Sequence, residues 1–495
     1  MVDQPLMLGP VDGDGEFRGY PFTGGGSTGY PDAAAVLRSY LGHPAFEVLF
    51  VADELDKQGA VVFDQPADRD SLPVLVKTAI STRCTGISYY EEAVREASEM
   101  VARHHVDESE ARTGVFLYRA GSVLEADLVI TSREWLLAER GRPLGRHLAS
   151  IVSPDEALAL MGLYLRWHSQ HVIVGGAAVQ WHPTTMRRSA AFVAMPAFER
   201  WNQAGRVWRG ANGDLTLESL NQTCLTRVSR AFKFRDNIFG LSATMAGNEP
   251  EEMLCELDSL LFNLVGAFDV AALIVDRVLG LCSDPRDCGW QKTTVSKDPG
   301  RSGWQTRLQA SAEALYSYTE ADSEMQQVFK VLRWLRNSVH DEALGVIRDE
   351  RVFVVTLPAD AQRRLKAFLK GFLDEEHSDW TTVSLGVRVQ PPGGATATRW
   401  LPGTGHRSVT LRRAGAPVSA DALEGQLVLD VRRFINKVFP AALTALNGIM
   451  QRTPLEQVPG YTRALEEPSR VILPWKFSDT TGHRLRMLYG ITELA

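Results

Sequence analysis

The predicted fold of the central part of this chain rests on one stretch, Phe329-Lys330-Val331-Leu332-Arg333-Trp334-Leu335-Arg336-Asn337-Ser338-Val339-His340. Its apolar residues recur at three- and four-residue spacing, which predicts an amphipathic helix. At roughly 100° per residue, Arg336 and His340 lie about 40° apart, and Arg333 returns to the face of His340 about two turns earlier. A permanent cation beside an imidazole suits phosphodiester chemistry. The same residues also fit a structural role, because cations are favoured at helix C-termini.

The residues around this stretch, from 216 to 345, are strongly helical in pattern. The predicted helices span residues 217–234, 251–281, 306–318 and 321–340. The second is almost continuously apolar from Leu257 to Leu279, so it must be buried in a bundle or against another subunit. Asp258, Asp269 and Asp276 interrupt it. Buried carboxylates need partners, which Arg333 or Arg336 could supply, although exposure of these acids at the surface fits equally well.

The step Arg336-Asn337, followed closely by His340 late in a helix, resembles the signature of HEPN-domain ribonucleases. That motif is an Arg, often followed by Asn, then about four to six residues, then His. Three residues separate Arg336 from His340, which is one fewer than usual. Six residues separate Arg333 from His340, but Trp334 then stands where a polar residue is usual. The resemblance covers residues 216–345 and leaves the choice between the two arginines open.

The resemblance implies a cytoplasmic, metal-independent RNA endonuclease of toxin or anti-phage-defence type, without a cofactor. His340 would serve as acid and base, Arg336 or Arg333 would hold the phosphate, and Asn337 would orient the phosphate or brace the imidazole. HEPN enzymes usually assemble a composite site from two copies, so the resemblance also implies a homodimer. An activator or antitoxin is a further expected partner. The alternative is a non-catalytic HEPN-like protein that serves dimerisation or nucleotide binding.

The rest of the chain predicts a multidomain protein. An N-terminal α/β domain, expected to act as sensor or regulator, and a C-terminal α+β region flank the all-α HEPN-like helical bundle. The predicted boundaries are a flexible lead-in at 1–30, the α/β domain at 31–150, a helical connector at 151–215, the bundle at 216–345 and the α+β region at 346–495. In the α/β domain the patterns predict strands at 46–51, 60–63, 114–118 and 126–131 and a helix at 90–104. Further helices are predicted at 154–167, where Ser153 supplies the helix start, and at 423–447.

Two further segments carry candidate chemistry. The run from Ala126 to Thr131 is similar to part of PIN-type nuclease domains, in which its acid, here Asp127, helps to hold a metal. A metal site needs several converging carboxylates, so an acid opening an ordinary buried strand is favoured. The arginine-rich loop at 388–413 could hold an RNA backbone or be a solvated, disordered loop. Its predicted RNA-binding residues are Arg399, Arg407, Arg412 and Arg413.

Composition sets the outer limits. The 495 residues exceed one ordinary core, and fractions of 44% hydrophobic and 23% charged residues are typical of soluble proteins. The net charge of −7 argues against a broad grip on nucleic acid, so any RNA contact should be local. No apolar run reaches about 18 residues, and the N-terminus lacks a signal-peptide pattern, so no membrane association is expected. Five irregularly spaced cysteines predict reduced thiols in the cytoplasm and no zinc site.

Overall fold

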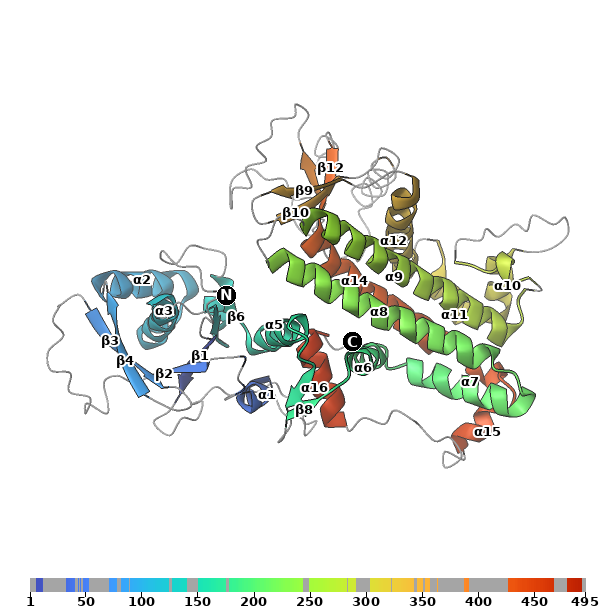
Figure 1. Cartoon of the computed structure of the whole chain (residues 1–495), viewed down its shortest axis with the longest axis horizontal. Helices are drawn as coiled ribbons and strands as arrows, with labels where there is room; N and C mark the ends of the chain where they lie inside the picture. Colours follow the sequence, from blue (N-terminus) through green and yellow to red (C-terminus); the bar gives the residue numbers. More distant parts are fainter. Residues whose placement is uncertain are drawn as a thin grey trace. The chain divides into compact units, whose positions relative to one another are not determined.

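The computed structural model forms two compact units, Met1–Trp181 with Phe477–Thr492, and His182–Lys476 with Glu493–Ala495. The residues that the structure describes are mostly helical, with small sheets (Figure 1). The structure describes residues 6–11, 33–40, 43, 45, 48–52, 71–77, 82–88, 90–123, 127–139, 150–174, 178–243, 249–282, 284–290, 303–321, 323–341, 345–349, 352–356, 363, 387–390, 426–466 and 479–491.

The first unit is built on a six-stranded sheet with the order β4-β3-β2-β1-β5-β6. Its strands are β1 (Leu6–Val11), β2 (Val48–Ala52), β3 (Ser71–Lys77), β4 (Thr82–Ser88), β5 (Leu128–Ile130) and β6 (Ser150–Val152). The strands β2, β1, β5 and β6 run parallel, and β3 and β4 continue the sheet as an antiparallel pair. Met7 of β1 pairs with Leu49 on one side and Val129 on the other, which makes β1 a central strand.

Helices and a hairpin complete the first unit. They are α1 (Ala33–Ser39), α2 (Tyr90–His104), α3 (Glu108–Val123), α4 (Glu134–Ala138), α5 (Pro154–Trp167), α16 (Asp479–Tyr489) and the hairpin of β7 (Val172–Val174) and β8 (Ala178–Gln180). Ser153 and Glu156 form a reciprocal capping box at the start of α5. The helix α5 also packs against α16, and the Arg166 guanidinium carbon of α5 lies 3.8 Å from the ring centroid of Tyr489 in α16. The helix α16 therefore belongs to the first unit, although it lies far along the sequence.

Two predictions in this unit are wrong. The residues from Leu6 to Val11 were expected in a flexible lead-in and instead form β1. The stretch Gly114–Tyr118, predicted as a strand from its β-branched and aromatic residues, lies inside α3. Tertiary packing overrides that local preference, because Val115 and Tyr118 recur at helical spacing and are both buried. The helix at 90–104 and a strand within 126–131 are confirmed, while 60–63 lies outside the described residues.

The second unit is a bundle of helices that carries a small sheet. The helices are α6 (Pro183–Ala194), α7 (Phe198–Asn212), α8 (Thr216–Ala243), α9 (Glu249–Leu279), α10 (Trp304–Ser311), α11 (Glu313–Thr319), α12 (Glu324–Asp341), α14 (Val431–Arg452) and α15 (Tyr461–Glu466). The two longest, α8 and α9, lie side by side (Figure 1). Phe268 of α9 contacts Phe329 of α12, and Phe232 of α8 contacts Phe439 of α14, at ring-centroid distances of 5.3 and 4.9 Å.

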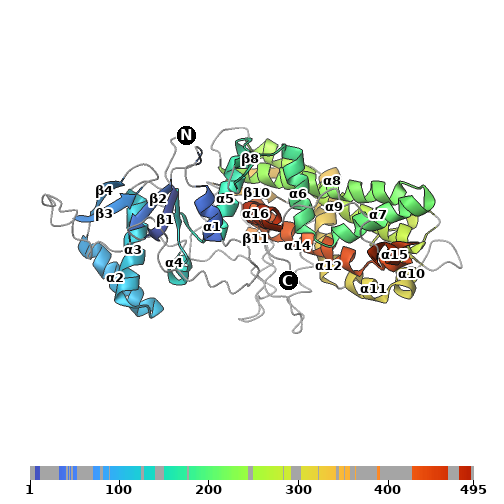
Figure 2. The same cartoon turned by 90° about the horizontal axis from the view of Figure 1, so that it is seen from below.

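The helix α9 is the core element of this bundle. It lies against α8, α12 and α14 (Figure 1 and Figure 2). Its segment Pro250–Leu279 is long and apolar enough to cross a membrane, but 72% of the most apolar window is buried inside the protein, as in the core helix of a bundle. Neighbouring helices of the same chain cover most of this apolar surface.

The sheet of the second unit is antiparallel, with the order β11-β12-β10-β9. Its strands are β9 (Gly345–Asp349), β10 (Val352–Thr356), β11 (Val387–Gln390) and β12 (Gln426–Asp430).

The compact units differ from the predicted boundaries at 216 and 345. The helices α6 and α7 precede the predicted bundle and α14 follows it, yet all three pack against α8. A predicted helix at 423–447 is in fact β12 followed by α14.

Candidate functional site

The helix α12 carries all of the predicted catalytic residues. Arg333, Arg336 and Asn337 are half-buried on this helix. His340 lies in its last turn, and its side chain lies outside what the structure describes. The predicted RNA-binding residues Arg399, Arg407, Arg412 and Arg413 also lie outside the described residues.

The face of α9 next to α12 carries Phe262, Gly266 and Asp269. Their spacing of four and then three residues places them on one side of the helix. The guanidinium carbon of Arg336 lies 5.6 Å from the ring centroid of Phe262. The guanidinium carbon of Arg227, which belongs to α8, lies 5.3 Å from the same centroid. Side chains of three helices therefore meet around one phenyl ring.

We call these residues the arginine patch: Arg227, Phe262, Gly266, Asp269, Arg333 and Arg336. The carboxylate of Asp269 lies in the electrostatic field of all three arginines. Crowding by protein atoms raises the pKa of Asp269, and Arg336, Arg333 and Arg227 act in the opposite direction. The Asp269 side chain is nevertheless solvent-exposed, so water screens both effects. Asp269 therefore interacts with Arg333 and Arg336 only through the electrostatic field, without an ion pair within 4.0 Å among the described residues.

The patch has a surplus of positive charge. Three arginines surround one carboxylate, and none of them forms an ion pair within 4.0 Å among the described residues. The buried Nε atoms of Arg227 and Arg336 have no hydrogen-bond partner in the described part of the chain. Arginine forks with unused donors bind phosphate and carboxylate groups bidentately. In a protein of net charge −7, this patch is a local concentration of positive charge.

Gly266 gives Arg227 its place on α9. A Cβ atom at Gly266 would lie 2.2 Å from Nη1 and 2.6 Å from Cζ of Arg227. Any larger residue would therefore displace this guanidinium from the helix surface. Sequence reasoning missed Arg227, Phe262 and Gly266. The spacing of Phe262, Gly266 and Asp269 by four and three residues could have shown that they share one face of α9. No sequence signal indicates that Arg227 of α8 packs against that face.

The PIN-type interpretation is not supported by the position of Asp127. This residue is exposed and directly precedes β5, so it lies at the amino edge of the parallel strands. Across the described residues, no group of three or more His, Cys, Asp or Glu side chains could hold a metal ion. Asp127 therefore has no described set of converging carboxylates, which a metal nuclease requires.

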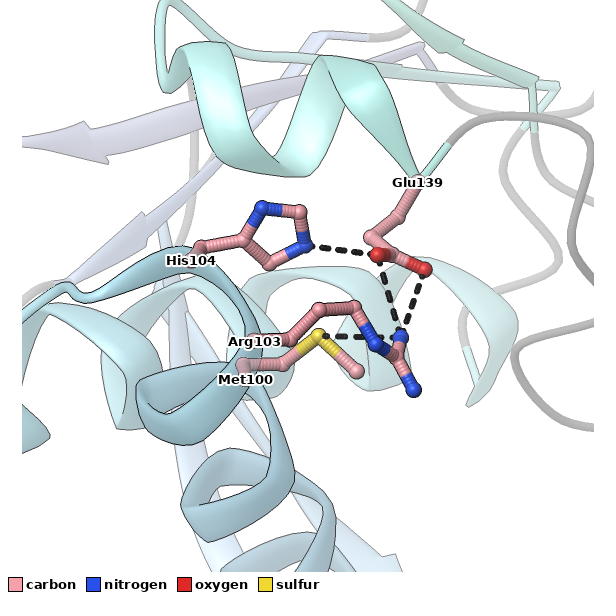
Figure 3. Close-up of polar contacts among 4 residues, drawn as sticks. All are labelled: Met100, Arg103, His104 and Glu139. Atoms are coloured by element: carbon pink, nitrogen blue, oxygen red, sulfur yellow. Dashed lines mark hydrogen bonds and ion pairs between the residues drawn. The ribbon is translucent and has the colours of Figure 1, made fainter.

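A second polar cluster ties α2 to the end of α4 in the first unit (Figure 3). The carboxylate of Glu139 is only 1% exposed, and Nη1 of Arg103 donates to both of its oxygens at 3.0 Å. Nε2 of His104 lies 2.6 Å from Oε1 of the same carboxylate. Buried charges must be paired, so this cluster is a structural clasp between two helices.

Comparisons with known proteins assign no family to this chain. No protein-family model matches the chain. No curated protein matches it, and no solved structure matches it.

Proposed function

We propose that this protein is a metal-independent RNA endonuclease of HEPN type. The observation that carries the proposal is the arginine patch, where Arg333 and Arg336 meet Arg227 on a surface with surplus positive charge. His340 belongs to the same helix as the first two arginines. A phosphate-binding surface and an acid–base residue on one helix are the parts that RNA cleavage without a metal requires.

Each residue has a distinct role in this mechanism. An imidazole removes the proton of a ribose 2′-hydroxyl, and the oxygen attacks the adjacent phosphorus. A protonated imidazole then donates its proton to the departing 5′-oxygen. The arginines neutralise the charge that grows on the non-bridging oxygens, with Arg336 favoured because it precedes Asn337. A second copy of the chain supplies the second imidazole, so the active form is a homodimer.

The biological class follows from the same resemblance. An RNase of this kind acts as a toxin or an anti-phage-defence effector in the cytoplasm and needs a control element. The first unit, with its own six-stranded sheet, is the proposed sensor or regulator. Its trigger would be an activator or an antitoxin.

The second candidate is a non-catalytic HEPN-like protein for dimerisation or nucleotide binding. The short spacing between Arg336 and His340 favours it, because three intervening residues are fewer than the family motif has. The RNase and a nucleotide-binding protein would both use the arginine patch to bind phosphate, but only the RNase needs His340.

Cleavage of a labelled RNA by the purified chain distinguishes them. We expect products in the presence of a chelator and none with His340→Ala, while both proteins bind the RNA. Absence of cleavage by the wild type, with binding retained, would favour the nucleotide-binding candidate. Loss of activity on chelation alone would instead indicate metal chemistry.

A further inference from the structure

We propose that the arginine patch selects single-stranded RNA, with an unpaired base against Phe262 and flanking phosphates on Arg227 and Arg336. This inference rests on the proposed function and adds the form of the substrate. Sequence-tolerant proteins that bind single strands use this combination, because every base has a π-face and every nucleotide has a phosphate.

The first support is the ring itself. Phe262 is 47% exposed, on a helix whose adjacent residues, Leu261 and Asn263, are both buried. A single exposed phenylalanine is ordinary on a protein surface. Here, however, two guanidinium groups from two other helices face the same ring. The remaining exposed part of the ring is accessible to a base that is not paired within a duplex.

The second support is the arrangement of charge around the ring. Arg227 and Arg336 reach Phe262 from α8 and α12, so they lie on two different neighbours of α9. Neither arginine forms an ion pair within 4.0 Å among the described residues. A base contacting the ring would bring its phosphates near these forks. Asp269 repels a third phosphate and is suited to accept a hydrogen bond from a base amino group or a ribose hydroxyl.

The third support is Gly266. Its missing side chain lets Arg227 lie against α9, one turn from Phe262. Glycine is costly inside a helix, and here its missing Cβ atom permits the close approach of Arg227. Gly266 therefore lets a cation lie beside an exposed aromatic ring.

The test is fluorescence anisotropy with the full chain carrying His340→Ala, so that RNA is not cut. The probes are a short labelled oligouridylate and the same strand annealed to oligoadenylate. Phe262→Leu should weaken single-strand binding by about fivefold or more, because one base–aromatic stack is lost. The slope of log affinity against log salt should not change. Arg227→Gln should also weaken binding and should reduce that slope by about 0.7, the effect of one lost phosphate contact.

Arg230→Gln is the matched control, since Arg230 is an exposed arginine one turn further along α8. It should change affinity less than Arg227→Gln does. Binding of the duplex as tightly as the single strand would overturn the proposal, and so would unchanged affinity in Phe262→Leu. A Phe262→Asp variant that turns a dimer into a monomer would also overturn the proposal, because that result would show that a second copy of the chain covers the ring in the wild-type dimer.

Failure here is distinguishable from failure of the proposed function. Cleavage that depends on His340, with binding that ignores Phe262, would remove only the single-strand site. Binding that depends on Phe262, in a protein whose wild type cuts no RNA, would remove only the nuclease.

Discussion

A Cβ atom on Gly266 would lie 2.2 Å from Nη1 of Arg227. Gly266→Ala therefore has two effects of opposite sign. Alanine in a helix interior is about 0.5–1 kcal/mol more favourable than glycine, and the obstructing atom is the end of a flexible side chain. Stability should stay the same or rise slightly. RNA affinity should fall, because Arg227 is pushed off the α9 surface. Thermal unfolding and anisotropy on the same preparation measure both effects.

Gly210→Ala in α7 is the control for this prediction, since nothing lies within 4 Å of a Cβ atom there. It should raise stability without changing RNA affinity. Equal affinity in wild type and Gly266→Ala would show that the position of Arg227 is irrelevant to binding.

His340→Ala should abolish RNA cleavage, or toxicity in cells, while leaving the fold intact. The reason is that His340 is the one acid–base residue that the HEPN resemblance assigns. The measurement is single-turnover cleavage at equal protein concentration, with the circular dichroism spectrum as the check on folding. If the variant cuts RNA as fast as the wild type, the enzymatic interpretation of α12 is wrong.

The two arginines of α12 should differ in their effects. Both face Asp269, and Arg336 exerts the larger electrostatic effect on it and also contacts Phe262. We therefore expect Arg336→Ala to lower the cleavage rate by about 100-fold or more, as loss of a charge-stabilising donor does. Arg333→Ala should cost less. Full activity in Arg336→Ala, with loss in Arg333→Ala, would reverse this assignment.

The sequence predicted local elements well and long-range partners poorly. Residues 154–167 were predicted as a helix with Ser153 at its start, and α5 has those bounds, because a capping residue and apolar spacing are local signals. The strand β1 was missed, since Leu6–Val11 is short and only gains its role from β2 and β5. In the site, the sequence left open whether Asp269 pairs with Arg333 or Arg336 or is exposed, and the structure shows an exposed carboxylate in the electrostatic field of both arginines. The contribution of Arg227 depends on how α8 packs, which no spacing along α9 encodes.

The clasp in the first unit should matter for stability rather than for RNA. Arg103→Met removes the hydrogen bonds from Nη1 to the buried Glu139 carboxylate and should destabilise the first unit by roughly 1.5–3 kcal/mol. Arg95→Met on the same helix is its control, because the Arg95–Glu92 pair is 3.8 Å long and its side chains are 70% and 50% exposed. That variant should change stability by less than about 0.5 kcal/mol. Urea unfolding measures both, and equal midpoints would refute a structural role for the Glu139 cluster.

The active protein should be a homodimer, because the proposed site needs two His340 imidazoles. The apolar surface of α9 no longer argues for this, since 72% of its most apolar window is buried within the chain. The remaining argument is that the chemistry needs two His340 imidazoles. A twofold axis near His340 would bring them together, because each residue close to such an axis lies near its own copy. Light scattering should give twice the chain mass of 54.7 kDa at micromolar concentration. The interface should bury more than about 1,000 Å² in total.

Mixed dimers give the sharper measurement. When wild-type chains are exchanged with His340→Ala chains, cleavage should fall faster than in proportion to the wild-type fraction, because a mixed dimer holds only one imidazole. A strictly proportional decrease, or a monomer mass with cleavage retained, would rule out the composite site. A dimer whose two His340 residues lie more than roughly 15 Å apart would keep the oligomer and favour the non-catalytic alternative. Proton transfer needs each group within about 3 Å of the atom it serves, and one substrate phosphate cannot bridge that gap.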